Sequence, residues 1–329
     1  MKTRAPLVTV IVASYNHVKF LPERMDSLLA QTYEETEVIV IDDASTDTSW
    51  AVLQKYRENV KVTLIRNERN LGWVKTSNLG LNLAKGKYVM FANCDDFSDK
   101  NQISLLVEFF EKNEEITAAF SSSYIVDEEG KKLDVDFDSR PRKFQKLCAV
   151  DCVIKQEDML GFLFHFIVIP NLSAVLFRKL SLLEVKGFST SVEIAADWEL
   201  YFRISALGPI GFVREPLNYF RSHNHSIRKK TKHSEMQIDI LKNLYLKYSN
   251  LTCGFPDKQR YQFSISTFAA ISMQELSLES YKLSIKLAKF LMNKNRSFGV
   301  PLLFQMSKQI IRLILRDLRI MIWQRGKLL

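Results

Sequence analysis

Two pairs of adjacent aspartates follow apolar runs, and their types and positions suit ligand chemistry. Asp42-Asp43 follows residues 37–41 (EVIVI), and Asp95-Asp96 follows residues 88–92 (YVMFA) closely. Short β-branched and aromatic runs are typical of buried parallel strands. Both pairs are therefore expected at the carboxyl ends of strands, the edge where open α/β sheets bind ligands. Carboxylates gathered there would repel one another unless a cation or ligand donors compensated them.

Strands and helices alternate along the first part of the chain. The expected strands are 7–13, 37–41, 60–65, 88–92 and 117–121, and the expected helices include 48–57, 73–84 and 100–112. This alternation predicts an α/β fold, a parallel sheet with helices on both faces. A less regular section follows Tyr124. A hairpin turn is expected at 127–130, a strand at 172–177 and an amphipathic helix at 195–206, and the sequence beyond Arg228 has a helical pattern.

The net charge of +9 is unevenly distributed along the 329 residues. Residues 228–329 hold 19 Lys and Arg against 6 Asp and Glu, so the rest of the chain is slightly acidic. This favours an anionic partner near the C-terminus and argues against a nucleic-acid-binding protein. The four cysteines have no C-x-x-C spacing, no secretory signal precedes Pro6, and no apolar run reaches the roughly 20 residues of a membrane span. A cytoplasmic protein is expected.

Taken in order, the motifs resemble those of the family-2 glycosyltransferases with the GT-A fold. The matching segments are 10–16 (VIVASYN), 41–47 (IDDASTD), 70–72 (NLG) with Asn78 and Gly80, 86–88 (GKY) before Asp95-Asp96, and 196–200 (ADWEL) with Arg221 and His223. The resemblance covers about residues 6–227. It implies one Rossmann-like, mostly parallel sheet whose half 1–127 binds the nucleotide sugar and whose half 128–227 binds the acceptor. A helical, basic region, 228–329, would follow.

The resemblance also assigns roles to residues of the donor site. Ala13 and Tyr15 would line the base pocket, and Asp43 would accept from a ring N–H of the base. Asp96 would bind Mn²⁺ or Mg²⁺ bridging the diphosphate, since hard cations prefer oxygen ligands, and Asp95 would reach the ribose or the metal's shell. The other implied donor contacts are Asn16, Asn70, Gly72, Asn78 and Arg221, with His223 as a further metal ligand. An exposed loop histidine without a ligand is the alternative for His223, and a helix cap is the preferred reading of Asp47.

Asp197 is the candidate catalytic base. It opens the expected helix 195–206, where the family places its acidic base, and an inverting transfer needs one carboxylate to take the acceptor's hydroxyl proton. Glu199 would point to a different side of that helix. A plain N-cap is the alternative role for Asp197.

The segment 302–324 carries basic residues on one helical face. Lys308, Arg312, Arg316 and Arg319 recur at spacings of 4, 4 and 3 residues. An interfacial helix or a helix packed on the domain both fit this pattern. Membrane contact at the inner face of the plasma membrane would suit a lipid-linked acceptor.

The implied reaction is inverting transfer of one sugar from a nucleoside diphosphate, UDP being the expected one, to a hydroxyl of a glycan or lipid-linked glycan in surface polysaccharide synthesis. A non-catalytic nucleotide-sugar-binding scaffold is one alternative. A sugar nucleotidyltransferase is another, but it would ordinarily need a glycine- and lysine-rich loop where this chain has Ser14-Tyr15-Asn16. No G-x-G-x-x-G motif of a dinucleotide-dependent enzyme follows residues 7–13.

Overall fold

The computed structural model describes residues 5–165, 168–191 and 195–223. The expected helices beyond Arg228, and with them the basic segment, lie outside these residues. The N-terminal half alternates strands and helices as expected. Its elements are β1 (Val8–Ser14), α1 (Leu21–Leu29), β2 (Thr36–Asp42), α2 (Ser49–Gln54), β3 (Val62–Arg66), α3 (Trp73–Leu83), β4 (Tyr88–Phe91), β5 (Phe97–Ser98), α4 (Gln102–Lys112) and β6 (Ala118–Val126).

The section after β6 contains more regular structure than its sequence indicates. Its elements are β7 (Lys132–Val135), a 3₁₀ turn η1 (Asp136–Ser139), α5 (Arg142–Leu147), β8 (Cys152–Ile154), α6 (Gln156–His165), a second 3₁₀ turn η2 (Leu172–Ala174), β9 (Val175–Arg178), α7 (Lys179–Glu184), α8 (Ala196–Ser205) and β10 (Ile210–Arg221). The expected hairpin turn at 127–130 joins β6 to β7, which pair in antiparallel fashion.

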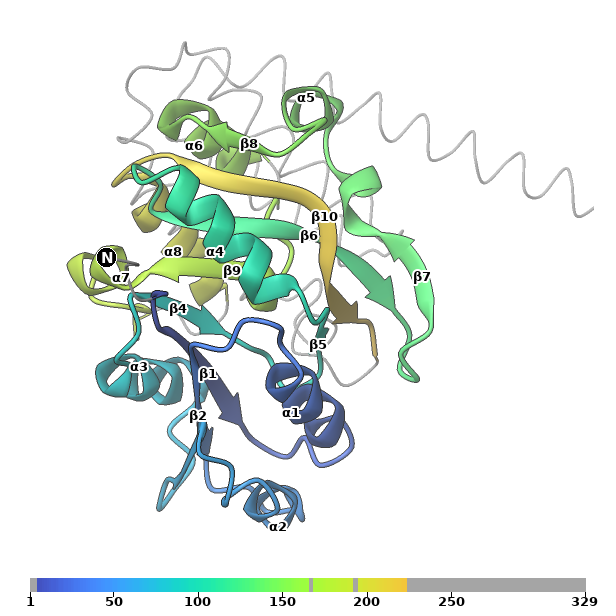
Figure 1. Cartoon of the computed structure of the whole chain (residues 1–329), viewed down its shortest axis with the longest axis vertical. Helices are drawn as coiled ribbons and strands as arrows, with labels where there is room; N and C mark the ends of the chain where they lie inside the picture. Colours follow the sequence, from blue (N-terminus) through green and yellow to red (C-terminus); the bar gives the residue numbers. More distant parts are fainter. Residues whose placement is uncertain (1–4, 166–167, 192–194, 224–329) are drawn as a thin grey trace, which may run out of the picture. The chain divides into compact units, whose positions relative to one another are not determined.

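The strands of the described residues form one mixed sheet of ten (Figure 1). Its order is β3-β2-β1-β4-β9-β6-β10-β5, with β7 paired to β6 and β8 to β10. Strands β3, β2, β1 and β4 run parallel to one another, and β6 is parallel to β10. Strand β9 runs antiparallel to both β4 and β6 and so joins the two parallel halves. The expected α/β fold is confirmed.

Side-chain alternation along β1 explains why helices cover both faces of the sheet (Figure 1). Val10 and Val12 belong to the main apolar cluster together with Leu21 and Met25 of α1. Ile11 points to the other face, where α3 approaches so closely that a Cβ at Gly80 would lie 2.4 Å from Ile11 Cγ2. A period-2 strand buried on both faces produces the continuous apolar run seen in the sequence.

One expected strand is partly wrong. Residues 172–177 were expected to be extended throughout, but Leu172–Ala174 forms η2 and only the following residues join the sheet as β9. The cause is Asn171, whose Oδ1 accepts a hydrogen bond from Ala174 N at 3.0 Å and stabilises the tight turn. Among the described residues no helix has the length and apolarity needed to span a bilayer.

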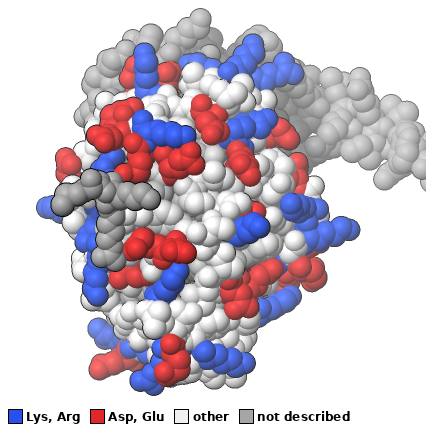
Figure 2. All heavy atoms as spheres, in the orientation of Figure 1, with Lys and Arg blue, Asp and Glu red and all other residues white. Residues whose placement is uncertain are grey.

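Acidic and basic side chains are interspersed over the face shown in Figure 2, and neither sign forms a broad patch there. This agrees with the nearly balanced charge of residues 1–227, which hold 27 Lys and Arg and 31 Asp and Glu.

Candidate active site

Three loops that carry predicted site residues meet the same edge of the sheet. Strands β1, β2 and β4 are parallel, so the segments after them leave from their carboxyl ends. The first loop begins at Tyr15, the second at Asp43 and the third at Ala92 (Figure 1). The parallel topology therefore brings the two aspartate pairs of the sequence to one edge.

Asn16 joins the loop after β1 to the loop after β2. Its Oδ1 accepts from Thr46 N at 2.8 Å and from Asp47 N at 3.3 Å, and its own backbone N–H donates to Ser45 Oγ at 3.0 Å. It adopts a left-handed φ of +56°, a conformation that asparagine tolerates better than most residues. The predicted donor residue Asn16 thus holds two loops in register. Asp47 precedes the N-cap residue of α2, Thr48, and its Oδ1 accepts from the N–H of the first helical residue, Ser49, at 2.8 Å.

The carboxylate of Asp43 organises the loop before α3. Its side chain is buried, Oδ1 accepts from Asn67 Nδ2 at 2.7 Å and from Leu71 N at 2.9 Å, and Oδ2 accepts from Gly72 N at 2.9 Å. Asn70 Oδ1 shares the Gly72 N–H at 2.9 Å. Gly72 has φ of +86°, which a side chain would strain. The structure therefore brings the predicted residues Asp43, Asn70 and Gly72 into one cluster.

Tyr15 and Ala13 stand at the end of β1. The Tyr15 side chain is 39% exposed and leaves an aromatic ring open to a ligand at the carboxyl edge. Ala13 is half-buried, and its carbonyl accepts a hydrogen bond from Cys94 Sγ at 3.2 Å, which ties β1 to the segment after β4. Burial raises the pKa of Cys94 to about 12, so its thiol stays protonated and keeps this bond.

Asn78 lies on α3 and makes two hydrogen bonds to the backbone of Phe188. Its Nδ2 donates to the Phe188 carbonyl and its Oδ1 accepts from the Phe188 N–H, both at 2.8 Å. The Phe188 ring packs against Phe91, the last residue of β4, with centroids 4.7 Å apart. The predicted donor residue Asn78 thus fixes segment 187–188 at the carboxyl end of β4.

Asp95 and His223 form a pair at this edge. His223 Nε2 and Asp95 Oδ2 are 2.9 Å apart, and the imidazole also packs on the ring of Phe20 at a centroid distance of 5.2 Å. The Asp95 side chain is 20% exposed. Burial works to raise the pKa of Asp95, but the hydrogen bond from His223 and the imidazoles of His17 and His223 outweigh it and hold this pKa below its usual value. Asp95 is therefore a partly exposed carboxylate that stays ionised.

Asp96 points into the protein. Its Oδ1 accepts from Arg221 N at 3.0 Å, its Oδ2 accepts from Ser173 Oγ at 2.6 Å, and the residue is 1% exposed. Burial and the charge of Asp95 raise the pKa of Asp96 to about 7, although Arg24 and these two donors oppose the shift. Both carboxylate oxygens thus have protein partners, unlike the arrangement expected for a metal ligand.

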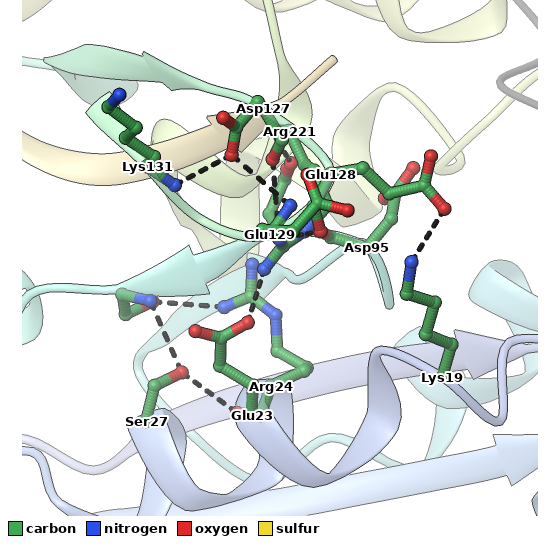
Figure 3. A network of polar contacts seen from close by, with 12 residues as sticks. Lys19, Glu23, Arg24, Ser27, Asp95, Asp127, Glu128, Glu129, Lys131 and Arg221 are labelled. Atoms are coloured by element: carbon green, nitrogen blue, oxygen red, sulfur yellow. Dashed lines mark hydrogen bonds and ion pairs between the residues drawn. The ribbon is translucent and has the colours of Figure 1, made fainter. Parts of the chain in front are cut away.

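Two buried arginines, Arg24 and Arg221, lie near Asp95, as Figure 3 shows. Arg24 of α1 is fully buried and donates from Nε to the Asn93 carbonyl at 2.8 Å and from Nη1 to Ser98 Oγ at 3.0 Å. Arg221 donates to the Asp95 carbonyl at 2.8 Å and forms an ion pair with Glu23. Arg24 is not among the residues predicted from the sequence for this site. Its signal was a lone cation on the apolar stripe formed by Leu21, Met25 and Leu28.

Asp197 stands in the first turn of α8. Its side chain is partly exposed, Oδ1 accepts from Trp198 N at 2.8 Å, and Trp198 Nε1 donates to the Leu163 carbonyl at 3.1 Å. The residue before the helix, Ala195, has a left-handed φ of +60°. Helix α8 therefore begins at a defined residue, Ala196, and the Asp197 carboxylate lies in its first turn, partly exposed.

Glu199 of the same helix has a structural role. It is fully buried and accepts from Arg203 Nε at 2.8 Å. Arg203 also donates to the Gly187 carbonyl at 2.8 Å, next to the Phe188 held by Asn78. This chain of contacts connects α8 to the carboxyl end of β4, and it makes Glu199 unsuitable as a base, as its helical position indicated.

Asp95 and His223, both named by the sequence as possible members of a metal shell, lie within hydrogen-bonding distance of each other. Among the described residues, no group of three or more His, Cys, Asp and Glu side chains gathers in a way that could hold a metal ion. A carboxylate and an imidazole at 2.9 Å nevertheless supply two adjacent ligands of the types that Mn²⁺ accepts, with substrate phosphate and water left to complete the shell.

Comparison with known proteins decides the family. The family model described as glycosyl transferase family 2 matches residues 9–162, which include β2, Asp43 and Asp95-Asp96. Residues 9–162, just under half of this chain, therefore form a family-2 glycosyltransferase domain. The expected family is therefore confirmed, and the match ends before Asp197, Arg221 and His223.

Curated relatives and solved structures agree with this membership. An uncharacterized glycosyltransferase of Haemophilus influenzae is 28% identical over 70% of this chain and 70% of its own length. The chondroitin synthase of Escherichia coli is 26% identical over 79% of this chain but only 34% of its own length, so this glycosyltransferase spans about a third of that relative.

Solved structures share the fold. The S. aureus TarS 1–349 complex with UDP-GlcNAc superposes with a TM-score of 0.66 at 18% identity, covering 87% of this chain and 81% of that one. The mannosyltransferase PcManGT of Pyrobaculum calidifontis, in complex with GDP-Man and Mn²⁺, gives a TM-score of 0.53 at 18% identity, covering 94% and 88%. The GT-A fold expected from the sequence is confirmed.

Proposed function

We propose that this glycosyltransferase moves one sugar, with inversion, from a nucleoside-diphosphate sugar to a hydroxyl of a glycan or lipid-linked glycan. The observation that carries the proposal is the Asp95–His223 pair at 2.9 Å at the carboxyl edge of the sheet, beside the loops that begin at Tyr15 and Asp43. UDP is the proposed nucleotide, because a UDP-sugar complex is among the structural neighbours. The chondroitin synthase relative favours a surface-glycan acceptor.

Asp95 and His223 are the proposed ligands of a divalent cation, in place of Asp96. The two oxygens of Asp96 are buried and already accept hydrogen bonds, whereas Asp95 is partly exposed and ionised. The complex of PcManGT with Mn²⁺ supports manganese as the first choice. A bound Mn²⁺ or Mg²⁺ would supply positive charge that stabilises the departing diphosphate.

Tyr15, Ala13 and the Asp43 cluster are the proposed base pocket. Tyr15 offers an exposed ring on which a base can stack, and the backbone of Ala13 borders it. Oδ2 of Asp43 accepts a hydrogen bond from Gly72 N, which Asn70 shares, so it retains capacity for a ring N–H of the base.

Asp197 is the proposed catalytic base. It is partly exposed in the first turn of α8, and α8 is tied to the carboxyl end of β4 through Arg203 and segment 187–188. The carboxylate would take the proton of the acceptor hydroxyl while that oxygen attacks the anomeric carbon from the face opposite the diphosphate. The C–O bond to the sugar forms as the bond to the diphosphate breaks.

The proposed function is tested first by ligand binding. The purified protein is heated with a panel of nucleotide sugars in the presence of Mn²⁺, because a ligand that binds the native state raises the melting temperature. At least one UDP-sugar is expected to raise it by several degrees. A panel in which none does so would contradict the donor proposal.

Product analysis then separates the alternatives. Release of UDP that is accelerated by glycan acceptors supports transfer. Binding without any UDP release would identify a nucleotide-sugar-binding scaffold, and release of pyrophosphate from sugar phosphate and UTP would identify a nucleotidyltransferase.

The proposed division into donor half 1–127, acceptor half 128–227 and basic region 228–329 can be tested by deletion. Deleting the last region should reduce binding to anionic vesicles, where a lipid-linked acceptor would reside.

A further inference from the structure

Arg221 is the last residue of β10, and its guanidinium is enclosed by the protein. The side chain is 2% exposed, and it forms an ion pair with Glu23 of α1, whose side chain is 48% exposed. The rings of Phe20 and Phe97 flank it at 5.0 and 5.3 Å. A buried cation with these neighbours is neutralised inside the protein and is not open to a substrate phosphate.

The polar atoms of Arg221 connect three other segments of the chain (Figure 3). Its Nε donates to the Asp95 carbonyl at 2.8 Å, and its Nη1 donates to the carbonyls of Glu128 at 2.6 Å and Asp127 at 3.3 Å. Its Nη2 faces Glu23. A guanidinium has five N–H donors, and three of its nitrogens are engaged here. A diphosphate could reach it only by displacing these partners.

These contacts hold the two proposed metal ligands, Asp95 and His223, next to each other. Arg221 holds the main chain of Asp95, and its own backbone N–H holds Asp96 at 3.0 Å. His223 follows two residues later in the chain, and its Nε2 meets the Asp95 carboxylate at 2.9 Å. Arg221 also binds the turn between β6 and β7, so the same side chain connects the donor half to the start of the proposed acceptor half.

We propose that Arg221 is a positioning residue, which holds Asp95 and His223 at ligand distance and anchors the turn 127–130 beside them without contacting the diphosphate. This inference rests on the proposed function, because the site it positions is the proposed nucleotide-sugar site. It replaces the donor-binding role expected for Arg221 from the sequence.

The test compares three variants of the full chain. Arg221→Lys keeps the charge but cannot reproduce the fork of donors. Glu23→Gln removes the carboxylate partner of Arg221. Because Glu23 is half-exposed, this variant is expected to fold even if Arg221→Lys does not, so the role of Arg221 can still be tested. Lys19→Gln is the matched control, since Lys19 contacts the same turn through a surface ion pair with Glu128 at 2.7 Å but does not touch Asp95.

The first measurement is UDP affinity with EDTA and with Mn²⁺. Changes to residues that orient metal ligands typically reduce metal affinity by 10- to 100-fold. In EDTA, the UDP affinity of Arg221→Lys is therefore expected to stay within about twofold of wild type. In Mn²⁺, its UDP affinity should fall at least about 10-fold below that of wild type. Glu23→Gln should show a smaller loss in the same direction, and Lys19→Gln should show none. An equal loss with and without Mn²⁺ would indicate phosphate contact and overturn the proposal.

The second measurement does not depend on a ligand. Hydrogen exchange of segment 93–98 is expected to accelerate in Arg221→Lys and Glu23→Gln, with segment 127–131 accelerating as well, whereas Lys19→Gln should affect only 127–131. Unchanged exchange at 93–98 in both test variants would overturn the positioning role. Failure of the wild-type protein to bind UDP would instead contradict the proposed function, and the exchange result would still decide the role of Arg221.

Discussion

Removal of the Asp43 carboxylate is expected to destabilise the protein, and the structure sets the magnitude. In Asp43→Ala, Gly72 N–H keeps its bond to Asn70 at 2.9 Å and the Asn67 amide keeps its bond to Thr76 Oγ1 at 3.3 Å, but Leu71 N–H loses its bond to Asp43. A hydrogen bond to a charged group contributes about 1.5–3 kcal/mol. All three bonds to the carboxylate are lost, but two of the three donors keep another partner, so the loss corresponds to about 3–4 kcal/mol of unfolding free energy.

Thermal and urea denaturation measure this effect. For a domain of this size about 1 kcal/mol lowers the melting temperature by roughly 2–4 °C, so Asp43→Ala should melt roughly 6–16 °C below the wild-type protein. Asp134→Ala is the matched control, because Asp134 is exposed on β7 and should change stability by less than about 0.5 kcal/mol. If Asp43→Ala melted within about 2 °C of wild type, the carboxylate would not organise the loop 67–72, and the reasoning would be refuted.

Three further changes test other parts of the site. Asn78→Ala removes both 2.8 Å bonds to Phe188 and should cost about 2 kcal/mol in urea unfolding, and an unchanged midpoint would contradict the anchoring role. Tyr15→Ala should weaken UDP binding in a calorimetric titration by about 10-fold, since stacking on a base is worth about 1–3 kcal/mol, while the melting temperature stays unchanged. For Asp47, burial raises the pKa, but hydrogen bonds from Ser49 and Val18 outweigh it and lower the pKa overall. Asp47 therefore contributes stability that is lost as pH falls through its folded pKa, so Asp47→Asn should lose less stability than wild type on acidification below about pH 4, and parallel acid curves would contradict this.

The parts of the fold that depend on local pattern were predictable from sequence. The runs that became β1, β2 and β4 are apolar and β-branched, and Asp43 and Asp95 follow them at the edge that parallel strands share. The secondary structure of the section after residue 128 was predicted less well. Its helices α5 and α7 have only six residues each, too few to show a helical period clearly.

The different environments of Asp95 and Asp96 could not be predicted from the sequence. The two residues are adjacent, and Asp96 is the one buried because Ser173 and Arg221, far along the chain, donate hydrogen bonds to its carboxylate. Likewise, Arg221 is buried because Glu23, 198 residues away, neutralises it. A sequence motif can propose such residues for a site, but tertiary packing determines which of them are buried and which stay exposed.

Turnover of Asp197→Asn tests the central claim most directly. Wild-type and variant proteins are compared at saturating UDP-sugar, Mn²⁺ and acceptor, with UDP release followed over time and donor affinity measured separately. The account predicts donor affinity within about twofold of wild type and a turnover lower by about 10²–10⁴-fold, the usual contribution of a general base. Turnover equal to that of wild type would contradict it.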